Sequence, residues 1–145
     1  FAKGVVETVK KLNWVPDIIH VHGWMAAMLP IYMKHFYKNE ALFSDTKIVT
    51  SVYGQSFDGS LDVEMINKIK FDGVPNDSIL DLETPNYENI MKATINHSDA
   101  VIIASENLTS SLTKFIESSG KPFLPFASKD NFAESYSNFY KNFVL

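Results

Sequence analysis

The sequence predicts an α/β domain built around a parallel sheet. Three short apolar runs, rich in Val and Ile, alternate with longer stretches in which apolar residues recur at helical spacing. This alternation is typical of strand–helix–strand units, whose crossover helices return the chain to the same end of the sheet. The 145 residues, 46% of them hydrophobic, can bury one core, so we expect three to four parallel strands flanked by helices.

The first third of the chain supplies two of the expected strands and two helices. Apolar residues at helical spacing predict a helix over residues 1–12, and the apolar run 17–21 predicts the first strand. Residues 24–38 are apolar almost throughout and predict a buried helix, in which Pro30 either kinks the helix or marks the end of its first turn. The β-branched segment 47–53 predicts the second strand.

The middle of the chain connects the second strand to the third. We expect a short helix over residues 61–69 and an irregular segment over 72–82. Thr84 is a suitable N-cap for a helix with Pro85 in its first position, because a Thr side chain accepts a backbone hydrogen bond and Pro lacks only a donor that is unpaired there. That helix is expected to extend to His97.

A third strand and a further helix follow. The apolar run 99–104 predicts the strand. We expect the helix to open at Glu106 or Asn107 and to run through Ser118. Gly120 is expected to end it in the left-handed conformation that glycine adopts easily.

The last part of the chain predicts an edge strand and a terminal helix. Residues 121–126 are expected at the edge of the sheet because their two prolines cannot donate backbone hydrogen bonds. Residues 130–145 predict a helix with an aromatic stripe that packs on the sheet. The stripe consists of Phe132, Tyr136, Phe139, Tyr140 and Phe143.

Composition narrows the range of partners. The net charge of -4 argues against nucleic acid, whose binding needs a concentrated basic surface. No apolar run approaches the roughly 20 residues that a bilayer crossing needs, so no membrane partner is expected. All 13 basic residues are Lys, whereas a nucleotide pyrophosphate is usually clamped by Arg. The chain is therefore poorly equipped to hold a nucleotide sugar alone.

Other features concern the setting of the chain. The absence of cysteine excludes a disulfide framework and fits a reducing compartment, so we expect a cytoplasmic protein. The chain begins with Phe within what reads as the tail of a helix, so residues 1–145 are expected to be a single-domain fragment of a longer protein. Strands missing before the first one would leave an exposed sheet edge, through which we expect a homodimer or a domain swap.

Polar and aromatic residues gather where the predicted strands end, which is where open α/β sheets bind ligands. His20 is expected to be a core histidine with its hydrogen bonds satisfied, whereas His22 is either a ligand contact or a cap for the next helix. Trp24 either stacks on a sugar face or packs between helix and sheet. The His spacing does not suit a metal site, so no metal is expected. Further candidates, either ligand contacts or solvated loop residues, are Tyr53, Gln55, Asp58, Ser105 and Glu106.

Three segments resemble bacterial glycogen synthases and plant starch synthases. The first is residues 16–24, Pro-Asp-Ile-Ile-His-Val-His-Gly-Trp, which is similar to that family's Pro-Asp-(apolar)-His-x-His-Asp-Trp-His. The second is residues 48–53, which resemble the family's strand ending Thr-(apolar)-His-Asn. The third is residues 98–105, similar to its Ala-Asp-x-(apolar)-x-Thr-Val-Ser-Pro block. Order and approximate spacing match over about residues 1–120.

This resemblance implies a fold and an activity. The family consists of GT-B type glycosyltransferases with two Rossmann-like domains facing each other across a cleft, so the chain is expected to be the C-terminal half of the N-terminal, acceptor-side domain. The parent would transfer glucose from a nucleotide-glucose donor to an α-1,4-glucan, with no metal or other cofactor. The residues expected to line the cleft are His22, Trp24, Tyr53 and Gln55.

Departures from the family pattern bear on catalysis. Gly23 and Met25 stand where the family has Asp and His. Val52 and Tyr53 stand where it has its active-site His and the neighbouring Asn. Neither Gly nor Val can hydrogen-bond a sugar through its side chain. The fragment itself is therefore expected to be inactive.

Two other functions stay open beside glycogen or starch synthesis. A non-catalytic glucan-binding or regulatory module would keep the fold and lack the polar residues of the family. Another two-domain glycosyltransferase, acting on cell-surface sugars, would share the architecture and differ in its donor.

Overall fold

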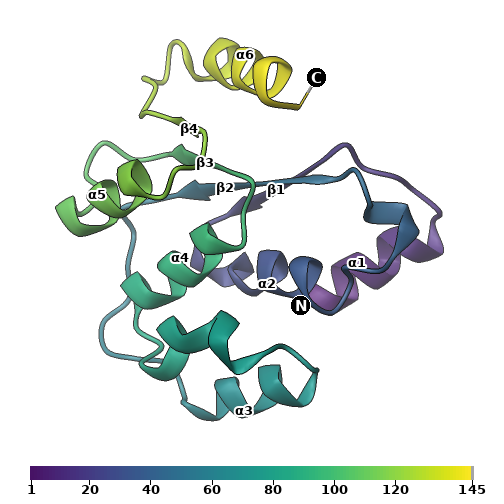
Figure 1. Ribbon diagram of the computed structural model, residues 1–145. Helices are drawn as coiled ribbons and strands as arrows, with labels where there is room; N and C mark the ends of the chain where they lie inside the picture. Colours follow the sequence, from purple (N-terminus) through teal and green to yellow (C-terminus); the bar gives the residue numbers. More distant parts are fainter. Residues whose placement is uncertain (145) are drawn as a thin grey trace.

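The computed structural model describes residues 1–144 and shows a four-stranded parallel sheet with helices on both faces (Figure 1). Neighbouring strands follow one another in sequence order and are all parallel. The strands are β1 (Ile18–His22), β2 (Lys47–Val52), β3 (Ala100–Ile103) and β4 (Phe123–Leu124). The predicted α/β fold is confirmed, and β4 is the short edge strand that its prolines indicate.

The helices of the described residues vary in length, and none has the length and apolar character of a membrane crossing. They are α1 (Ala2–Lys11), α2 (Met28–Lys34), α3 (Glu64–Phe71), α4 (Tyr87–Asn96), α5 (Ser110–Ser118) and α6 (Phe132–Val144). Short 3₁₀ segments cover Trp24–Ala26, Ala41–Phe43 and Asn76–Glu83.

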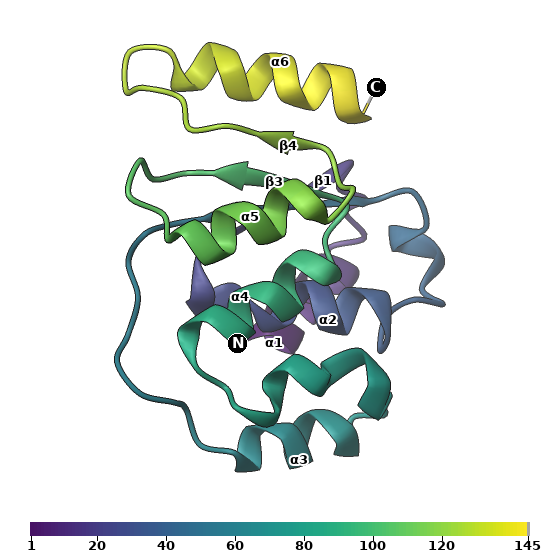
Figure 2. The same cartoon turned by 60° about the vertical axis from the view of Figure 1, so that its left-hand side comes forward.

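The sequential strand order decides which helices cover which face. A right-handed crossover places its helix on one face, and each further step in the same direction places the next helix on that same face. Figures 1 and 2 show α1, α2, α4 and α5 on one side of the sheet, with α3 in a layer farther out. The opposite side is covered by α6, the only described helix there.

Hydrophobic cores lie on both sides of the sheet, because successive strand residues point to opposite faces. On the crossover side, Val52 and Val101 pack with Met91 of α4 and Leu112 of α5. On the other side, the aromatic stripe of α6 packs on the sheet as predicted. That second core joins Val49, Ala100 and Ile102 to Tyr136, Phe139, Tyr140 and Phe143. Phe132, at the start of the stripe, is exposed.

The single helix predicted over residues 24–38 is wrong in extent. The chain first forms a 3₁₀ turn, Trp24–Ala26, and then α2 ends at Lys34. Pro30 lies in the first turn of α2, where its missing N–H leaves no hydrogen bond unmade. The apolar run indicated burial correctly, since five of the seven α2 residues are buried.

The segment between β2 and α4 is also more helical than expected. The helix predicted over 61–69 is found at Glu64–Phe71. The segment 72–82, expected to be irregular, contains 3₁₀ turns over Asn76–Glu83 that are interrupted at Ile79. Ile79 and Leu82 are buried there, so packing holds these turns in place.

Both predicted helix starts in the second half are displaced. Thr84 is not the N-cap of α4; Asn86 is, and its side chain accepts a hydrogen bond from the Asn89 backbone N–H at 2.9 Å. Helix α5 does not open at residue 106 or 107 but after Thr109, whose hydroxyl caps it. Gly120 has the predicted left-handed backbone, with φ of 70°.

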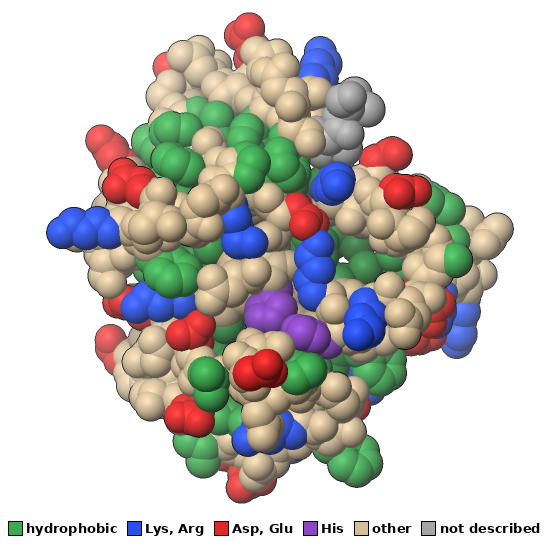
Figure 3. Space-filling model, in the orientation of Figure 1, with side chains coloured by type: hydrophobic (Ala, Val, Ile, Leu, Met, Phe, Trp, Pro, Cys, Tyr) green, Lys and Arg blue, Asp and Glu red, His purple; other side chains and the backbone are tan. Residues whose placement is uncertain are grey.

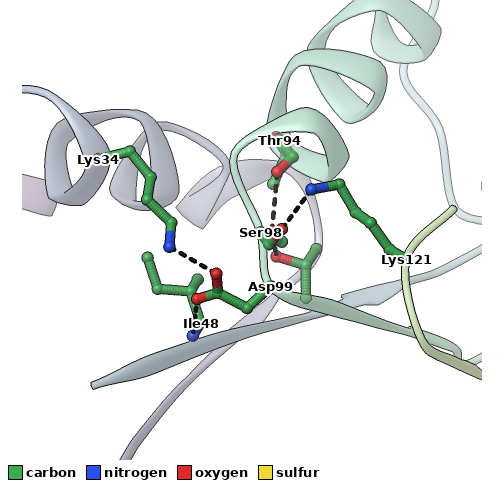
Figure 4. A network of polar contacts seen from close by, with 7 residues as sticks. Lys34, Ile48, Thr94, Ser98, Asp99 and Lys121 are labelled. Carbon is green, nitrogen blue, oxygen red and sulfur yellow. Dashed lines mark hydrogen bonds and ion pairs between the residues drawn. The ribbon is translucent and has the colours of Figure 1, made fainter. Parts of the chain in front are cut away.

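A polar network ties the amino ends of the strands together (Figure 4). Asp99 accepts one hydrogen bond from Lys34 of α2 at 2.6 Å and another from the Ile48 backbone N–H at 2.8 Å. Lys121, which precedes β4, donates to the Ser98 carbonyl at 2.6 Å. Asp99, the acidic residue of the third segment that resembles the family, therefore holds α2, β2 and β3 together. These contacts lie at the amino ends of the strands, whereas the predicted site residues lie at the carboxyl ends.

Candidate functional site

The carboxyl ends of β1 and β2 bring the four predicted cleft residues together. His22 ends β1 and lies beside Ser51 in the register, while Tyr53 directly follows β2. A cavity of about 230 Å³ opens at this edge, here called the strand-end cavity. It is lined by His22, Gly23, Trp24, Met25, Tyr53 and Gln55. The predicted residues thus share one cavity, and their contact with a ligand stays a prediction.

Gly23 turns the chain sharply out of β1. Its φ of 65° and ψ of -175° lie in a region that essentially only glycine adopts. Its N–H donates to the Ser51 carbonyl at 3.1 Å, which fixes the turn against β2. The Asp that the glycogen and starch synthases carry at this position would be strained in this backbone.

His22 and Tyr53 form a hydrogen-bonded pair across the ends of the two strands. The His22 Nδ1 and the Tyr53 hydroxyl oxygen are 2.9 Å apart. Burial lowers the pKa of His22, and burial raises the pKa of Tyr53. Both side chains are therefore uncharged at neutral pH and can hydrogen-bond a neutral ligand.

Tyr53 is held in place by a residue that sequence reasoning missed. The hydroxyl of Tyr87, the first residue of α4, donates to the Tyr53 carbonyl. Burial raises the pKa of Tyr87, so this donor keeps its proton. No local pattern marks Tyr87, because its partner lies in another element.

His20 is the satisfied core histidine that the sequence predicts. Its Nε2 lies 2.7 Å from the Ser51 hydroxyl oxygen, and its Nδ1 lies 2.6 Å from the Tyr140 hydroxyl oxygen. Burial, together with the neighbouring His22, lowers the pKa of His20 to about 4. His20 thus connects β1 to α6 and has no ring nitrogen left for a ligand.

Trp24 packs between helix and sheet and also borders the strand-end cavity. Its ring centroid is 4.8 Å from that of Phe57, and it contacts the core on the crossover side. Packing, one of the two alternatives for this residue, is therefore shown. Stacking of the remaining surface on a sugar stays a prediction.

A second cavity, of about 320 Å³, lies beside the first on the side of α6; we call it the α6 cavity. His22 and Tyr53 line both cavities. The outer wall comes from the loop after β4 and from α6, through Phe126, Phe132 and Tyr136. Sequence reasoning assigned Phe132 and Tyr136 to packing on the sheet, or to an association surface if exposed, and gave no role to Phe126.

The other polar candidates lie elsewhere. Asp58 and Glu106 are exposed, and neither they nor Ser105 line the two cavities.

His35 and His97 form a separate pair with Nε2 atoms 3.0 Å apart. Figure 3 shows adjacent histidines on the face that carries the ends of α2 and α4. Among residues 1–144, no group of three or more His, Cys, Asp or Glu side chains is placed to hold a metal ion.

Comparison with known proteins decides the family. A family model described as "Starch synthase catalytic domain" matches residues 1–120. The chain belongs to this family. The match includes α1 to α5, β1 to β3 and the whole strand-end cavity, whereas β4 and α6 lie beyond it.

Curated relatives support the assignment. A glycogen synthase of Clostridium perfringens is 32% identical over 109 residues, which are 73% of this chain and 22% of the relative. A glycogen synthase of Chlorobium limicola is 41% identical over 69 residues, which are 48% of this chain and 14% of the relative. The chain thus spans about a fifth or less of the length of these relatives. No solved structure gives a significant match.

Proposed function

We propose that this starch synthase family chain is the C-terminal half of an N-terminal glycosyltransferase domain, and that the parent protein transfers glucose from a nucleotide-glucose donor to an α-1,4-glucan. The observation that carries the proposal is the family match over residues 1–120, which includes every residue of the strand-end cavity. The relatives named glycogen synthase supply the reaction. A cytoplasmic location, expected from the absence of cysteine, is part of this proposal.

In this proposal the strand-end cavity contacts the glucan acceptor. Trp24 offers an aromatic surface for the CH-rich face of a glucosyl ring, while His22, Tyr53 and Gln55 offer hydrogen bonds to its hydroxyl groups. The uncharged state of His22 and Tyr53 suits a neutral sugar. The nucleotide would be held mainly by parts of the parent outside this chain, since the chain has 13 Lys and no Arg.

The decisive experiment is release of nucleotide diphosphate by the full-length parent, given ADP-glucose or UDP-glucose with and without glycogen. Glycogen-dependent release is the expected result. In the parent, Gln55→Ala should raise the KM for glycogen, whereas Asn67→Ala, an exposed substitution on α3, should leave it unchanged. The same KM for glycogen in both variants would contradict the assignment of the strand-end cavity to the acceptor site.

A non-catalytic glucan-binding module is the second candidate, and two positions favour it. Val52, at the position of the family's active-site His, is fully buried in the crossover-side core and does not line either cavity. Gly23 has a backbone that disfavours the family's Asp. Glycogen binding without release of nucleotide diphosphate from either donor would select this candidate over the synthase.

The outer edge of β1 is a candidate surface for association between two copies of the chain. Among the described strands β1 pairs on one side only, with β2, so its other edge can pair with a further strand. We propose that two copies of the isolated chain associate through this edge, as a homodimer or a domain swap. Sedimentation velocity over a range of concentrations tests this, and a monomer at all concentrations would reject it.

A further inference from the structure

The α6 cavity has the dimensions and position of a ligand site. Its volume of about 320 Å³ falls within the roughly 300–1,000 Å³ typical of small-ligand pockets. It opens at the carboxyl ends of the strands, between β3 and the start of α6. Its outer wall comes from residues beyond 120, so it is not part of the region that matches the family.

The two cavities share a polar ridge. His22 and Tyr53 contribute to both, and their hydrogen bond of 2.9 Å runs along the boundary. A ligand that fills one cavity therefore lies against the same polar groups as a ligand that fills the other. This arrangement suits consecutive units of one chain, in which hydroxyl groups recur beside each ring.

The walls of the α6 cavity favour a neutral sugar over other small ligands. Phe126 and Phe132 are 43% and 52% exposed, and the Phe132 and Tyr136 rings meet edge to face at 5.9 Å. Exposed aromatic rings stack on the CH-rich face of a sugar. Lys129 is the only side chain in the lining with a permanent charge, so the cavity has neither the carboxylates of a cation site nor the several cations of a diphosphate site.

We propose that the α6 cavity is a second glucosyl-binding subsite, so that one α-glucan chain passes from the strand-end cavity over the His22–Tyr53 ridge to the aromatic wall of α6. This inference rests on the proposed function, because it takes the glucan as the ligand. It adds a binding surface supplied by α6, outside the matched residues.

The test is calorimetric titration of the 145-residue chain with maltoheptaose and, separately, with maltose. Phe132→Ala should weaken maltoheptaose binding about three- to tenfold, the value of one aromatic stacking contact. Phe71→Ala is the matched control, since Phe71 is 92% exposed at the end of α3 and far from both cavities in sequence and fold. Phe132 is itself half exposed, so its removal should leave the circular dichroism spectrum unchanged.

Each outcome has a defined meaning. Weaker maltoheptaose binding in Phe132→Ala but not in Phe71→Ala supports the subsite. This holds even if Gln55→Ala binds normally, because that result contradicts only the assignment of the strand-end cavity. Equal affinity of Phe132→Ala and the unsubstituted chain overturns the subsite while leaving the proposed function intact, provided that Gln55→Ala binds more weakly. Absence of any maltoheptaose binding overturns the subsite, whereas the proposed function is decided separately by release of nucleotide diphosphate from the full-length parent.

Discussion

Gly23 is the residue at which this chain departs from its family for a reason visible in the backbone. A side chain there would meet only ordinary contact, with Tyr53 Cδ2 at 3.7 Å. The obstacle is conformational, because φ of 65° combined with ψ of -175° is costly for any residue with a Cβ. The turn that places Gly23 in the wall of the strand-end cavity is thus one in which the family's Asp would be strained.

Gly23→Asp, which restores the residue typical of the family, should lower the free energy of unfolding by about 1–3 kcal/mol. Urea denaturation followed by circular dichroism measures this. Gly4→Asp is the control, because Gly4 lies in α1 with open space around it and should change stability by less than about 1 kcal/mol. Equal stability of the two variants would contradict the argument.

His20 gives the stability of the fold a pH dependence of known sign. Its pKa is about 4 in the folded chain and about 6.5 when unfolded, so between these values the unfolded chain binds more protons. Stability is therefore complete above about pH 6.5 and falls as the pH drops towards 4. Because His20 is only half-buried, we expect it to contribute about 1–2 kcal/mol of this loss.

His20→Gln should flatten this profile between pH 6.5 and 4, since Gln keeps a hydrogen-bonding side chain that does not titrate. Burial also lowers the pKa of His22, His35 and His97, so some pH dependence of the same sign should persist. Urea midpoints across this range measure the difference. Identical profiles for the variant and the unsubstituted chain would show that His20 does not couple protonation to folding.

At the scale of the elements, the structure shows which of two candidate residues, Thr84 or Asn86, caps the start of α4. Asn86→Ala should cost about 1 kcal/mol, because it removes the side-chain acceptor for the Asn89 N–H at the start of α4. Thr84→Ala should change stability by less than about 0.5 kcal/mol, since only its backbone carbonyl is used. Thermal or urea unfolding of the two variants tests the assignment, and a larger loss for Thr84→Ala would refute it.

Local signals in the sequence were sufficient for the strands but not for every helix boundary. The β-branched run Lys47–Val52 and the left-handed Gly120 each depend on their own residues, and both were predicted correctly. The start of α4 depended on which of two candidate cap residues, Thr84 or Asn86, the fold uses. The helix predicted over 24–38 ends early because the chain turns at His35 after α2 has buried its apolar residues.

The candidate site divides in the same way. His22 and Tyr53 could be anticipated because parallel strands end at a common edge. Tyr87 and the aromatic wall of α6 could not, because their positions follow from contacts between distant elements. The bond between Tyr140 and His20 joins residues 120 positions apart, and no periodicity reports such a contact.

For the whole molecule, the sequential strand order makes α6 the sole described cover of one sheet face. Phe139→Ser should destabilise the chain by about 2 kcal/mol or more and expose that face, because Phe139 packs on the buried residues of the second core. Phe132→Ser, on the same helix but half exposed, should cost less than about 1 kcal/mol.

Limited proteolysis and binding of a hydrophobic dye report the same change. In Phe139→Ser, cleavage between β4 and α6 should become faster and dye fluorescence should rise, whereas Phe132→Ser should resemble the unsubstituted chain. Equal behaviour of both variants would mean that α6 does not hold itself to the sheet through its aromatic stripe.

The contact between His20 and Tyr140 also has a consequence for the newborn chain on the ribosome. The two partners are 120 positions apart. At a translation rate of about 5–20 residues per second, roughly 6–24 s therefore pass between the synthesis of β1 and that of its partner on α6. During that interval the crossover helices can already assemble on one face, while Val49, Ala100 and Ile102 stay exposed to solvent on the other. Until α6 covers it, this strip is transiently exposed apolar surface of the kind that chaperones protect.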